Sequence, residues 1–486
     1  MNIGTNNPEI YNADVAVVGG GAAGLAAAVA AVQKGKKTII LEKMHACGGN
    51  GLFPMGLAAV GSFLQKNMNI RADADDMFRH VMEYSHWNAD PRLNRILLDR
   101  SGETIEWLRD MGVNFTNVIA HYPGQNPPVY HTVSPPGNTG GAVVRRLVEN
   151  FRKLDGNILT HTRGRQLLFD KGHAVCGVLA ETDKGEKIQV DAPAVIVATG
   201  GFAGNDDLLR RLIPDYDPKD YLYIHGARPE GDGFIMMEQA GAKVDRNIAI
   251  AGGAPQITAK RTAVSRLISR PYPIWLNIRG ERFADEMVVY DMALGVNVLR
   301  RQPKKTCYVI LDSAILKQIN DEGRDPMEQM GLPPNVEDRF EEDYQRCVNE
   351  GYAIIVETLE GIAEFMGLPA KKVQEAVEEY NGFCASGRDA LFCKDQRLMM
   401  PVKTPPYYVI KAGIDQLFTW GGVVINHRFQ VLDNSLMPIK GLYSAGNDSA
   451  GGIDGDTYNF AMSGHAFGYS VIGGRIAGEI ASEQTE

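Results

Sequence analysis

Three glycines near the start of the chain have the spacing of a phosphate-binding turn. Gly19, Gly21 and Gly24 form a GxGxxG pattern between the apolar segment DVAVV and an alanine-rich segment of helical composition. The first glycine permits a tight turn, the second lets backbone approach a pyrophosphate at the helix N-terminus, and the third permits close helix–strand packing. Glu42 ends the next apolar segment, where its carboxylate can accept a hydrogen bond from a ribose hydroxyl. The pattern therefore predicts a dinucleotide cofactor.

Two later segments favour FAD as this dinucleotide. VIVATGG at 195–201 and GLYSAGN at 441–447 have the composition of buried strands that end in small residues, which let backbone approach a cofactor. With the glycine-rich start, they resemble flavoproteins with two dinucleotide folds. A further glycine-dense segment, GGIDGDTYNFAMSGH at 451–465, contains Tyr458, whose phenol is there either for packing or for chemistry.

Hydrophobic periodicity predicts the elements that hold these residues. Residues 13–45 predict a strand, a glycine turn, a helix and a second strand, and residues 76–111 predict two amphipathic helices. Residues 112–141, rich in Pro, Gly and Asn, predict a long irregular loop. Residues 145–200 predict a helix, several short strands and the buried strand AVIVATGG, and 231–244 another helix.

The composition changes along the chain in a way that suggests an insertion. After residue 245 the sequence becomes loop-rich and then charged and helical, and from about 401 it is again strand-like. We expect an α/β fold in which a Rossmann-like FAD-binding domain is built from discontinuous segments, 1–245 and 401–486. Residues 246–400 are expected to form an inserted α+β capping domain that contacts the substrate.

Composition excludes several classes of function. The net charge of -9, without a basic stripe, argues against nucleic-acid binding. The six cysteines form no CxxC pair, so neither a metal site nor a dithiol redox pair is expected. No signal-peptide pattern begins the sequence and no apolar run is long enough for a membrane segment, so a cytoplasmic protein is expected.

Motifs spread over both ends of the chain resemble one flavoprotein group. VVGGGAAGLAAAVAA, CGGNG at 47–51, ATGGF, RGERFADE at 279–286, WGGVVIN and GLYSAGN are similar to the fumarate reductase/succinate dehydrogenase flavoprotein superfamily, which includes 3-ketosteroid dehydrogenases and urocanate reductases. The resemblance implies that substrate lies between the capping domain and a flavin ring near 47–51. Because the loop ACGGNGLFPMG lacks the histidine of covalent members, non-covalent FAD is expected.

The resemblance and the motifs together give the expected cofactor contacts. The residues expected to bind FAD are Gly19, Gly21, Ala22, Ala23, Gly24, Glu42, Lys43, Gly48, Gly49, Asn50, Gly51, Ala198, Thr199, Gly200, Gly446, Asn447 and Ser463.

Three positions depart from the fumarate reductase pattern. In the pattern that fumarate reductases share, the position of Tyr290 is an arginine that donates the proton, and the position of Phe418 is a histidine that binds substrate. The segment GGIDGDTYN at 451–459 has no arginine to clamp a carboxylate. A site for two carboxylates needs fixed cations. Fumarate and succinate are therefore not the expected substrates.

The same positions resemble the ketosteroid dehydrogenase branch, in the segments RFADEMVVYD and GLYSAGNDSAGGIDGDTY. The resemblance implies that Tyr290 transfers a proton at the substrate α-carbon and that Tyr458 donates a hydrogen bond to a substrate carbonyl. Because NFAMSG after Tyr458 is shorter than the corresponding loop of that branch, the steroid itself stays open.

The expected function is oxidoreduction of the CH–CH or C=C bond beside a carbonyl of a cyclic, apolar small molecule. Hydride would be exchanged with flavin N5, and an electron partner would complete the cycle. One alternative is an enoate reductase that binds a mono-carboxylate through a cap arginine. Another, of a different class, is an FAD-holding or electron-transfer subunit with no substrate of its own.

A few other residues have possible roles. His121 and Tyr122, in HYPGQNPPVYH, are expected to line a substrate entrance, and Phe418 to contact substrate. The spacing of Arg261, Arg266 and Arg270 does not fit one helical face, which predicts a solvated loop, with a substrate carboxylate contact as the alternative. His465 begins the last apolar helix, where a cap or backbone partner is expected.

Overall fold

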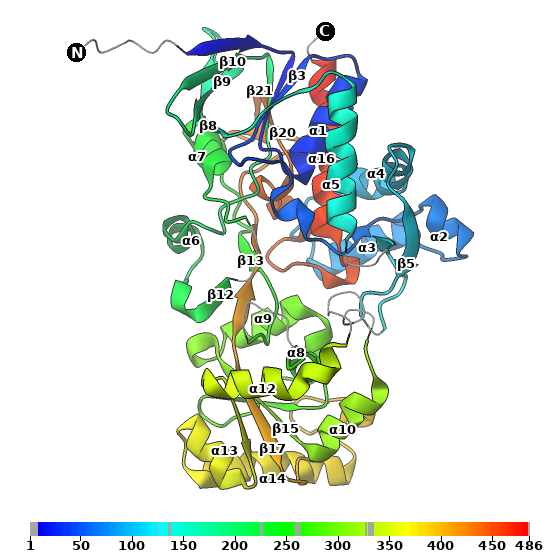
Figure 1. Cartoon of the computed structure of the whole chain (residues 1–486), viewed down its shortest axis with the longest axis vertical. Coiled ribbons are helices and arrows are strands. Elements are labelled where there is room, and N and C mark those ends of the chain that lie inside the picture. Colours follow the sequence, from blue (N-terminus) through cyan, green and yellow to red (C-terminus); the bar gives the residue numbers. More distant parts are fainter. Residues whose placement is uncertain are drawn as a thin grey trace, which may run out of the picture.

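The chain folds into two lobes, which Figure 1 shows one above the other. The computed structural model describes residues 8–122, 124–134, 138–223, 227–257, 263–325, 328 and 335–484. The upper lobe contains both ends of the described chain, and the lower lobe is formed by the inserted segment. The expected α/β class is confirmed, since both lobes combine sheets with helices.

A six-stranded sheet forms the centre of the upper lobe, in the order β20–β21–β11–β2–β3–β7. Its five strands from β21 to β7 are parallel, and β20 is antiparallel to β21. The central strands are continuous apolar runs because both faces of the sheet are covered. The bounds are β2 (Val15–Val18), β3 (Thr38–Leu41), β7 (Asn157–Leu159), β11 (Ala194–Val197), β20 (Gln430–Leu432) and β21 (Pro438–Ser444).

Three helices lie side by side on this lobe, and Figure 1 shows them as nearly parallel columns. They are α1 (Ala22–Gln33), α5 (Thr139–Lys153) and α16 (His465–Glu483). Helix α16 approaches α1 very closely, since a Cβ at Gly474 would lie 2.2 Å from the carbonyl oxygen of Ala23. A Cβ at Gly478 would lie 2.1 Å from that of Ala27. Only glycine therefore permits this packing.

A second sheet in the upper lobe has the order β1–β10–β9–β8 and contains the predicted run of short strands. Its strands are β1 (Glu9–Asn12), β8 (Thr162–Phe169), β9 (Val175–Thr182) and β10 (Lys187–Asp191). The nearby helices are α6 (Asp206–Leu212) and α7 (Asp232–Gln239).

The prediction of a long irregular loop at 112–141 was wrong in part. Strands β5 (Phe115–Ile119) and β6 (Tyr130–Val133) pair within it, and β6 also pairs with β4 (Leu57–Ala58). The two amphipathic helices predicted before it are α3 (Ala74–Tyr84) and α4 (Pro91–Asp110), and a short helix α2 (Phe63–Asn67) precedes them.

The lower lobe is built on an antiparallel sheet in the order β14–β15–β17–β16. The strands are β14 (Ile274–Asn277), β15 (Cys307–Asp312), β16 (Ala353–Val356) and β17 (Tyr407–Ala412). Because β17 belongs to this sheet, we place the return to the upper lobe after Ala412 rather than at 401. The helices are α8 (Ser265–Ile268), α9 (Met292–Arg300), α10 (Ser313–Glu322), α12 (Phe340–Asn349), α13 (Leu359–Met366) and α14 (Ala370–Ser386).

Two small strand pairs, β12–β18 and β13–β19, lie where the lobes meet. Their bounds are β12 (Tyr221–Tyr223), β13 (Ala249–Ala251), β18 (Ile414–Gln416) and β19 (Phe418–Trp420). Across the described part of the chain, no helix has the length and apolar character that crossing a bilayer requires.

A buried ionic cluster fixes the RGERFADE segment in the lower lobe. The Arg282 guanidinium donates to both carboxylate oxygens of Glu286 at 2.9 Å, and to Asp389 at 3.0 Å. The Lys394 ammonium lies 3.0 Å from Glu286, and the Arg282 guanidinium lies 4.7 Å from the ring centre of Tyr380. These contacts hold the start of the short 3-10 helix η3 (Glu286–Tyr290). This helix ends at Tyr290, one of the two predicted catalytic residues.

Candidate active site

The predicted phosphate-binding turn has the expected geometry. A Cβ on Gly24 would lie 1.9 Å from the carbonyl oxygen of Gly19, so helix α1 and the turn are in direct contact. Gly21 is the N-cap of α1, with no side-chain cap and no acidic residue in the first turn. No heavy atom lies within 4 Å of the position that a Cβ on Gly21 would take. The free N–H groups at this helix end can therefore receive a pyrophosphate.

Glu42 lies at the end of β3 and is oriented by backbone. One carboxylate oxygen accepts from the Gly20 N–H at 2.7 Å and the other from the Met44 N–H at 2.7 Å. Each oxygen keeps a second lone pair that could accept from a ribose hydroxyl. The ammonium of Lys43 instead lies 3.4 Å from carboxylate oxygens of both Glu230 and Asp232.

The loop at 47–51 lies against the same turn. The Gly48 N–H donates to the Gly20 carbonyl at 2.8 Å, and a Cβ on Gly51 would lie 2.9 Å from the Cβ of Ala22. Residues Gly49–Leu52 form the short helix η1. The buried Oδ1 of Asn50 has no hydrogen-bond partner among the described residues, so a polar group of a bound cofactor could satisfy it.

Asp448 was not predicted, and it fixes the ATGG turn. This fully buried carboxylate accepts from the backbone N–H groups of Thr199, Gly200 and Gly201, at 3.0 Å for the last two. It also accepts from the Thr199 hydroxyl at 3.0 Å. Burial raises the pKa of Asp448, and these donors oppose that rise. Its position directly after GLYSAGN was the available signal.

Three more of the predicted cofactor residues, Ala198, Gly446 and Asn447, lie at the same place. A Cβ on Gly19 would lie 2.3 Å from the Ala198 carbonyl oxygen, and one on Gly446 would lie 3.1 Å from the Cβ of Ala23. A Cβ on Gly201 would lie 3.4 Å from the Cβ of Asn447. Ser463 is buried just before α16, and its hydroxyl donates to the Phe460 carbonyl at 2.7 Å. Segments from four parts of the chain thus form one cradle around the N-terminus of α1, and their glycines and free N–H groups fit an FAD pyrophosphate.

The Tyr458 phenol lies inside an aromatic enclosure. Its ring centre is 4.3 Å from that of His465, in a stacked arrangement. Phe460, Trp420 and Phe418 meet it edge-on at 5.2, 5.4 and 5.9 Å. Burial raises the pKa of Tyr458 well above its usual range. The phenol is therefore held protonated.

The Tyr458 hydroxyl is placed by the last helix. Its oxygen accepts from the Ala466 N–H in the first turn of α16 at 3.3 Å. An accepting hydroxyl keeps its own proton to donate. The hydroxyl can therefore serve as a hydrogen-bond donor to a bound molecule.

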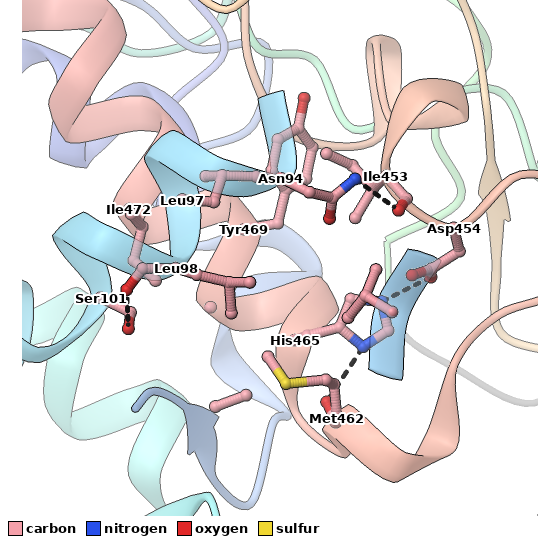
Figure 2. A pocket seen from close by; sticks show the side chains of 13 residues that line it. Asn94, Leu97, Leu98, Ser101, Ile453, Asp454, Met462, His465, Tyr469 and Ile472 are labelled. Atoms are coloured by element: carbon pink, nitrogen blue, oxygen red, sulfur yellow. Dashed lines mark hydrogen bonds and ion pairs between the residues drawn. The ribbon is translucent and has the colours of Figure 1, made fainter. Parts of the chain in front are cut away.

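His465 makes the backbone contact that was expected and a contact with a carboxylate side chain that was not. Its Nδ1 lies 3.0 Å from the Met462 carbonyl oxygen, and its Nε2 lies 2.5 Å from Oδ2 of Asp454. Figure 2 shows the two side chains pointing toward each other beside a small cavity. Asn94 of α4 holds the segment before Asp454 by donating to the Ile453 carbonyl at 2.9 Å.

Tyr290 ends η3 and is partly buried. Burial raises the pKa of its phenol, the positive charge of Arg270 opposes this, and the carboxylates of Asp325 and Glu322 add to it. Tyr290 therefore faces a charged group of lower-lobe residues.

The sequence predicted that Arg266 and Arg270 lie on a solvated loop, and this prediction was wrong. Arg266 and Arg270 are 5% and 4% exposed. The Arg270 guanidinium donates to Glu328 at 2.7 Å and to the Gly323 carbonyl at 2.8 Å, and Arg266 donates to Glu328 at 3.5 Å. They are buried because acidic residues of the following segment neutralise them. Arg261 lies outside the described residues.

One hydroxyl joins the segments of the two predicted catalytic tyrosines. The hydroxyl oxygen of Tyr84, the last residue of α3, lies 3.0 Å from a carboxylate oxygen of Asp291 and 3.3 Å from the Tyr458 carbonyl oxygen, and its one proton points between these two acceptors. Asp291 directly follows Tyr290 in the chain. A second contact between the lobes runs from the Asn297 amide to the Thr457 hydroxyl at 3.0 Å. These hydrogen bonds thus fix the position of the lower lobe relative to the loop that contains Tyr458.

His121 and Tyr122 lie near these contacts. The buried His121 ring stacks on Tyr130 with ring centres 4.6 Å apart, and it also faces Phe460 at 6.4 Å. Burial, with the nearby charge of Asp291, raises the pKa of Tyr122 to about 12. His121 therefore adjoins the aromatic enclosure and Tyr122 lies near Asp291, while their predicted role at a substrate entrance stays a prediction.

The sequence and fold are similar to those of known flavoproteins. Residues 14–457 match the family described as FAD binding domain. The chain is 32% identical to a vinyl phenol reductase of Lactiplantibacillus plantarum, over 97% of each chain. It is 28% identical to a fumarate reductase (cytochrome) of Shewanella frigidimarina, over 97% of this chain and 77% of that one. A 3-ketosteroid-Δ4-(5α)-dehydrogenase from Rhodococcus jostii RHA1 has the same fold, with TM-score 0.75 and 24% identity over 99% of this chain and 98% of that one.

Proposed function

The chain belongs to the FAD binding domain family of flavoproteins, and we propose that it is an FAD-dependent reductase of a C=C bond conjugated to an oxygen-bearing ring. FAD is its cofactor, and the prediction of non-covalent attachment stays a prediction. The proposed substrate is a neutral cyclic small molecule, either an enone or a vinyl-substituted phenol.

The observation that carries this proposal is the aromatic enclosure around Tyr458. Aromatic walls favour a flat ring, and a buried phenol that keeps its proton favours a substrate oxygen over a carboxylate pair. Of the three cap arginines considered as carboxylate contacts, Arg266 and Arg270 are already paired with carboxylates. This arrangement supports a neutral substrate over the enoate alternative.

Similarity to a vinyl phenol reductase supports the second substrate class. A vinyl phenol that releases its phenolic proton to water and gains a proton at the terminal vinyl carbon becomes a quinone methide, a vinylogous enone. In both classes hydride then adds to carbon and negative charge develops on one oxygen. Named reductases among the relatives also support an enzyme over a non-catalytic FAD-holding subunit.

Two phenols of the chain would then have separate roles. Bound FAD would supply the hydride through its N5. Tyr458 would donate a hydrogen bond to the substrate oxygen as negative charge develops there. Stabilisation of developing charge by such donors is usually the largest single contribution to catalysis. Tyr290 would deliver a proton to the second carbon of the double bond.

The protonation of both phenols supports reduction as the working direction. Burial raises the pKa of Tyr290 and of Tyr458 above the usual phenol value. A proton donor must be protonated before the reaction, whereas dehydrogenation would need one phenol to act as a base. Raised values favour the first arrangement.

Anaerobic flavin reoxidation tests the proposal. The purified protein, photoreduced without oxygen, is mixed with 4-vinylphenol, an androstenedione-type enone, urocanate, cinnamate or fumarate, and flavin absorbance is followed. We expect rapid reoxidation by one of the two neutral compounds and by none of the three carboxylates. Reoxidation by fumarate alone would show that the reasoning from Tyr290, Phe418 and Tyr458 is wrong.

A variant tests the role of Tyr458 in the same assay. Tyr458→Phe keeps the ring in its enclosure and removes the hydroxyl. We expect a loss of about 100- to 1,000-fold in the reoxidation rate, the usual cost of one donor to a developing oxyanion. FAD content should stay unchanged. Equal losses of rate and of bound FAD would make the residue structural.

A further inference from the structure

We infer that Asp454 and His465 form a buried hydrogen-bonded pair that positions the Tyr458 phenol for its hydrogen bond to the substrate oxygen. The inference rests on the proposed function, because it gives the pair a task only if Tyr458 has one. Under this inference, His465 and Asp454 do not touch the reacting atoms. They are positioning residues that act through Tyr458.

The hydrogen bonds of His465 leave its ring no freedom to turn. A carbonyl oxygen can only accept, so Nδ1 must carry a proton for its 3.0 Å contact with Met462. Nε2 lies 2.5 Å from Oδ2 of Asp454, so the second edge of the ring is also held by a hydrogen bond. Both edges of the imidazole are therefore fixed, one by backbone and one by a side chain.

Asp454 is itself firmly held. It is 2% exposed, and its Oδ2 also accepts from the Asn459 N–H at 3.3 Å. Asn94 fixes the preceding Ile453 carbonyl from helix α4, as Figure 2 shows. The cavity of about 40 Å³ beside the pair has mainly apolar walls, among them Leu97 and Ile472. Such surroundings strengthen the bond between Nε2 and the carboxylate.

The fixed imidazole in turn fixes the phenol. The two rings stack at 4.3 Å with an angle of 22° between their planes. His465 is the first residue of α16, and the next residue, Ala466, donates its N–H to the phenol oxygen at 3.3 Å. One helical turn therefore sets both the plane of the Tyr458 ring and the position of its hydroxyl, and the bond to Asp454 anchors that turn.

A double-mutant cycle tests the inference in the anaerobic reoxidation assay. The variants are Asp454→Asn, Tyr458→Phe and the two combined, with His465→Phe as a second way to break the pair while keeping a stacked ring. We expect Asp454→Asn and His465→Phe each to slow reoxidation about 10- to 100-fold, the range found when the hydrogen-bond partner of a metal-bound histidine is removed. In the Tyr458→Phe background, Asp454→Asn should cost less than 3-fold, because residues that act as a unit are not additive.

Controls separate positioning from general damage. Tyr469→Phe removes a buried hydrogen bond of the same helix, to the Ser449 carbonyl at 2.9 Å, and should change the rate less than 3-fold. All variants should keep FAD. Proton NMR with labelled histidine should show a far-downfield imidazole signal that disappears in Asp454→Asn.

The outcomes distinguish the two proposals. If Tyr458→Phe is slow but the loss from Asp454→Asn is the same in both backgrounds, the pair is merely structural and only this inference is wrong. An unchanged rate in Asp454→Asn would also overturn it. If Tyr458→Phe itself reacts at the normal rate, the role proposed for Tyr458 is wrong, and the positioning role falls with it.

Discussion

Replacing Gly21 by alanine should block FAD binding while leaving the protein folded. Gly21 is the N-cap of α1 in an extended conformation, with φ -73°, that any residue can adopt. Apart from its two chain neighbours, an added Cβ would meet no heavy atom within 4 Å in the part of the chain that the structure describes. We therefore expect the unfolding free energy of the apoprotein to change by less than about 1 kcal/mol, within the range for N-cap substitutions.

The cost should appear when the cofactor binds. The new methyl group would occupy the space in front of the α1 N-terminus, and ligand atoms could not approach it more closely than about 3.5 Å. If the pyrophosphate loses two charge-assisted hydrogen bonds, binding weakens by about 3–4 kcal/mol, or roughly 100- to 1,000-fold in Kd.

The assay is titration of apoprotein with FAD, followed by flavin fluorescence, together with urea unfolding. Gly382→Ala, in the interior of α14 with no heavy atom within 4 Å of the new Cβ, is the matched control and should bind FAD normally. Gly24→Ala should instead destabilise the apoprotein itself, because its Cβ would lie 1.9 Å from an oxygen. An unchanged FAD affinity in Gly21→Ala would refute the placement of the pyrophosphate.

Three further predictions follow from contacts around the site. Asp448→Asn should lower the unfolding free energy by about 2–4 kcal/mol and reduce FAD content, because an amide cannot accept from all the donors of the ATGG turn; urea unfolding and flavin absorbance measure this. Tyr84→Phe should lower the reoxidation rate without loss of FAD, since the lobes lose their shared hydroxyl, whereas Tyr11→Phe, at a surface contact, should not. Burial raises the pKa of Tyr290, so its phenol stays protonated up to and beyond pH ~10. The rate of the reductive reaction should therefore not fall through phenol ionisation at lower pH. A decline centred near pH ~8 that Tyr290→Phe abolishes would contradict this.

The parts of the site that depend on short sequence spacing could be predicted. Gly19, Gly21 and Gly24 fall within one turn and the helix that follows it, so a local pattern specifies them. Glu42 was found because the strand–helix–strand unit has a nearly fixed length. The contacts of Asp448 with Thr199 join residues 249 apart in sequence, and no local pattern reports such a pairing.

The errors have the same physical origin. Strand β6 was missed because its partners are β4 and β5 rather than a hairpin with a clear turn signal. Arg266 and Arg270 were assigned to solvent because charge alone predicts exposure, whereas Glu328 neutralises them from a distant segment. The Asp454–His465 pair also depends on how an irregular loop folds back, which periodicity does not describe.

The close contact between α1 and α16 affects the order in which the cofactor site can form during synthesis. The phosphate-binding turn leaves the ribosome early, but Gly474 and Gly478, which pack on the backbone of α1, follow about 450 residues later. At ribosomal rates of roughly 5–20 residues per second, the delay is about 20–90 s. During this interval α1 lacks the helix that covers it, so the nascent chain must keep an apolar surface from aggregating. FAD capture is therefore expected only after residue 478 has been synthesised.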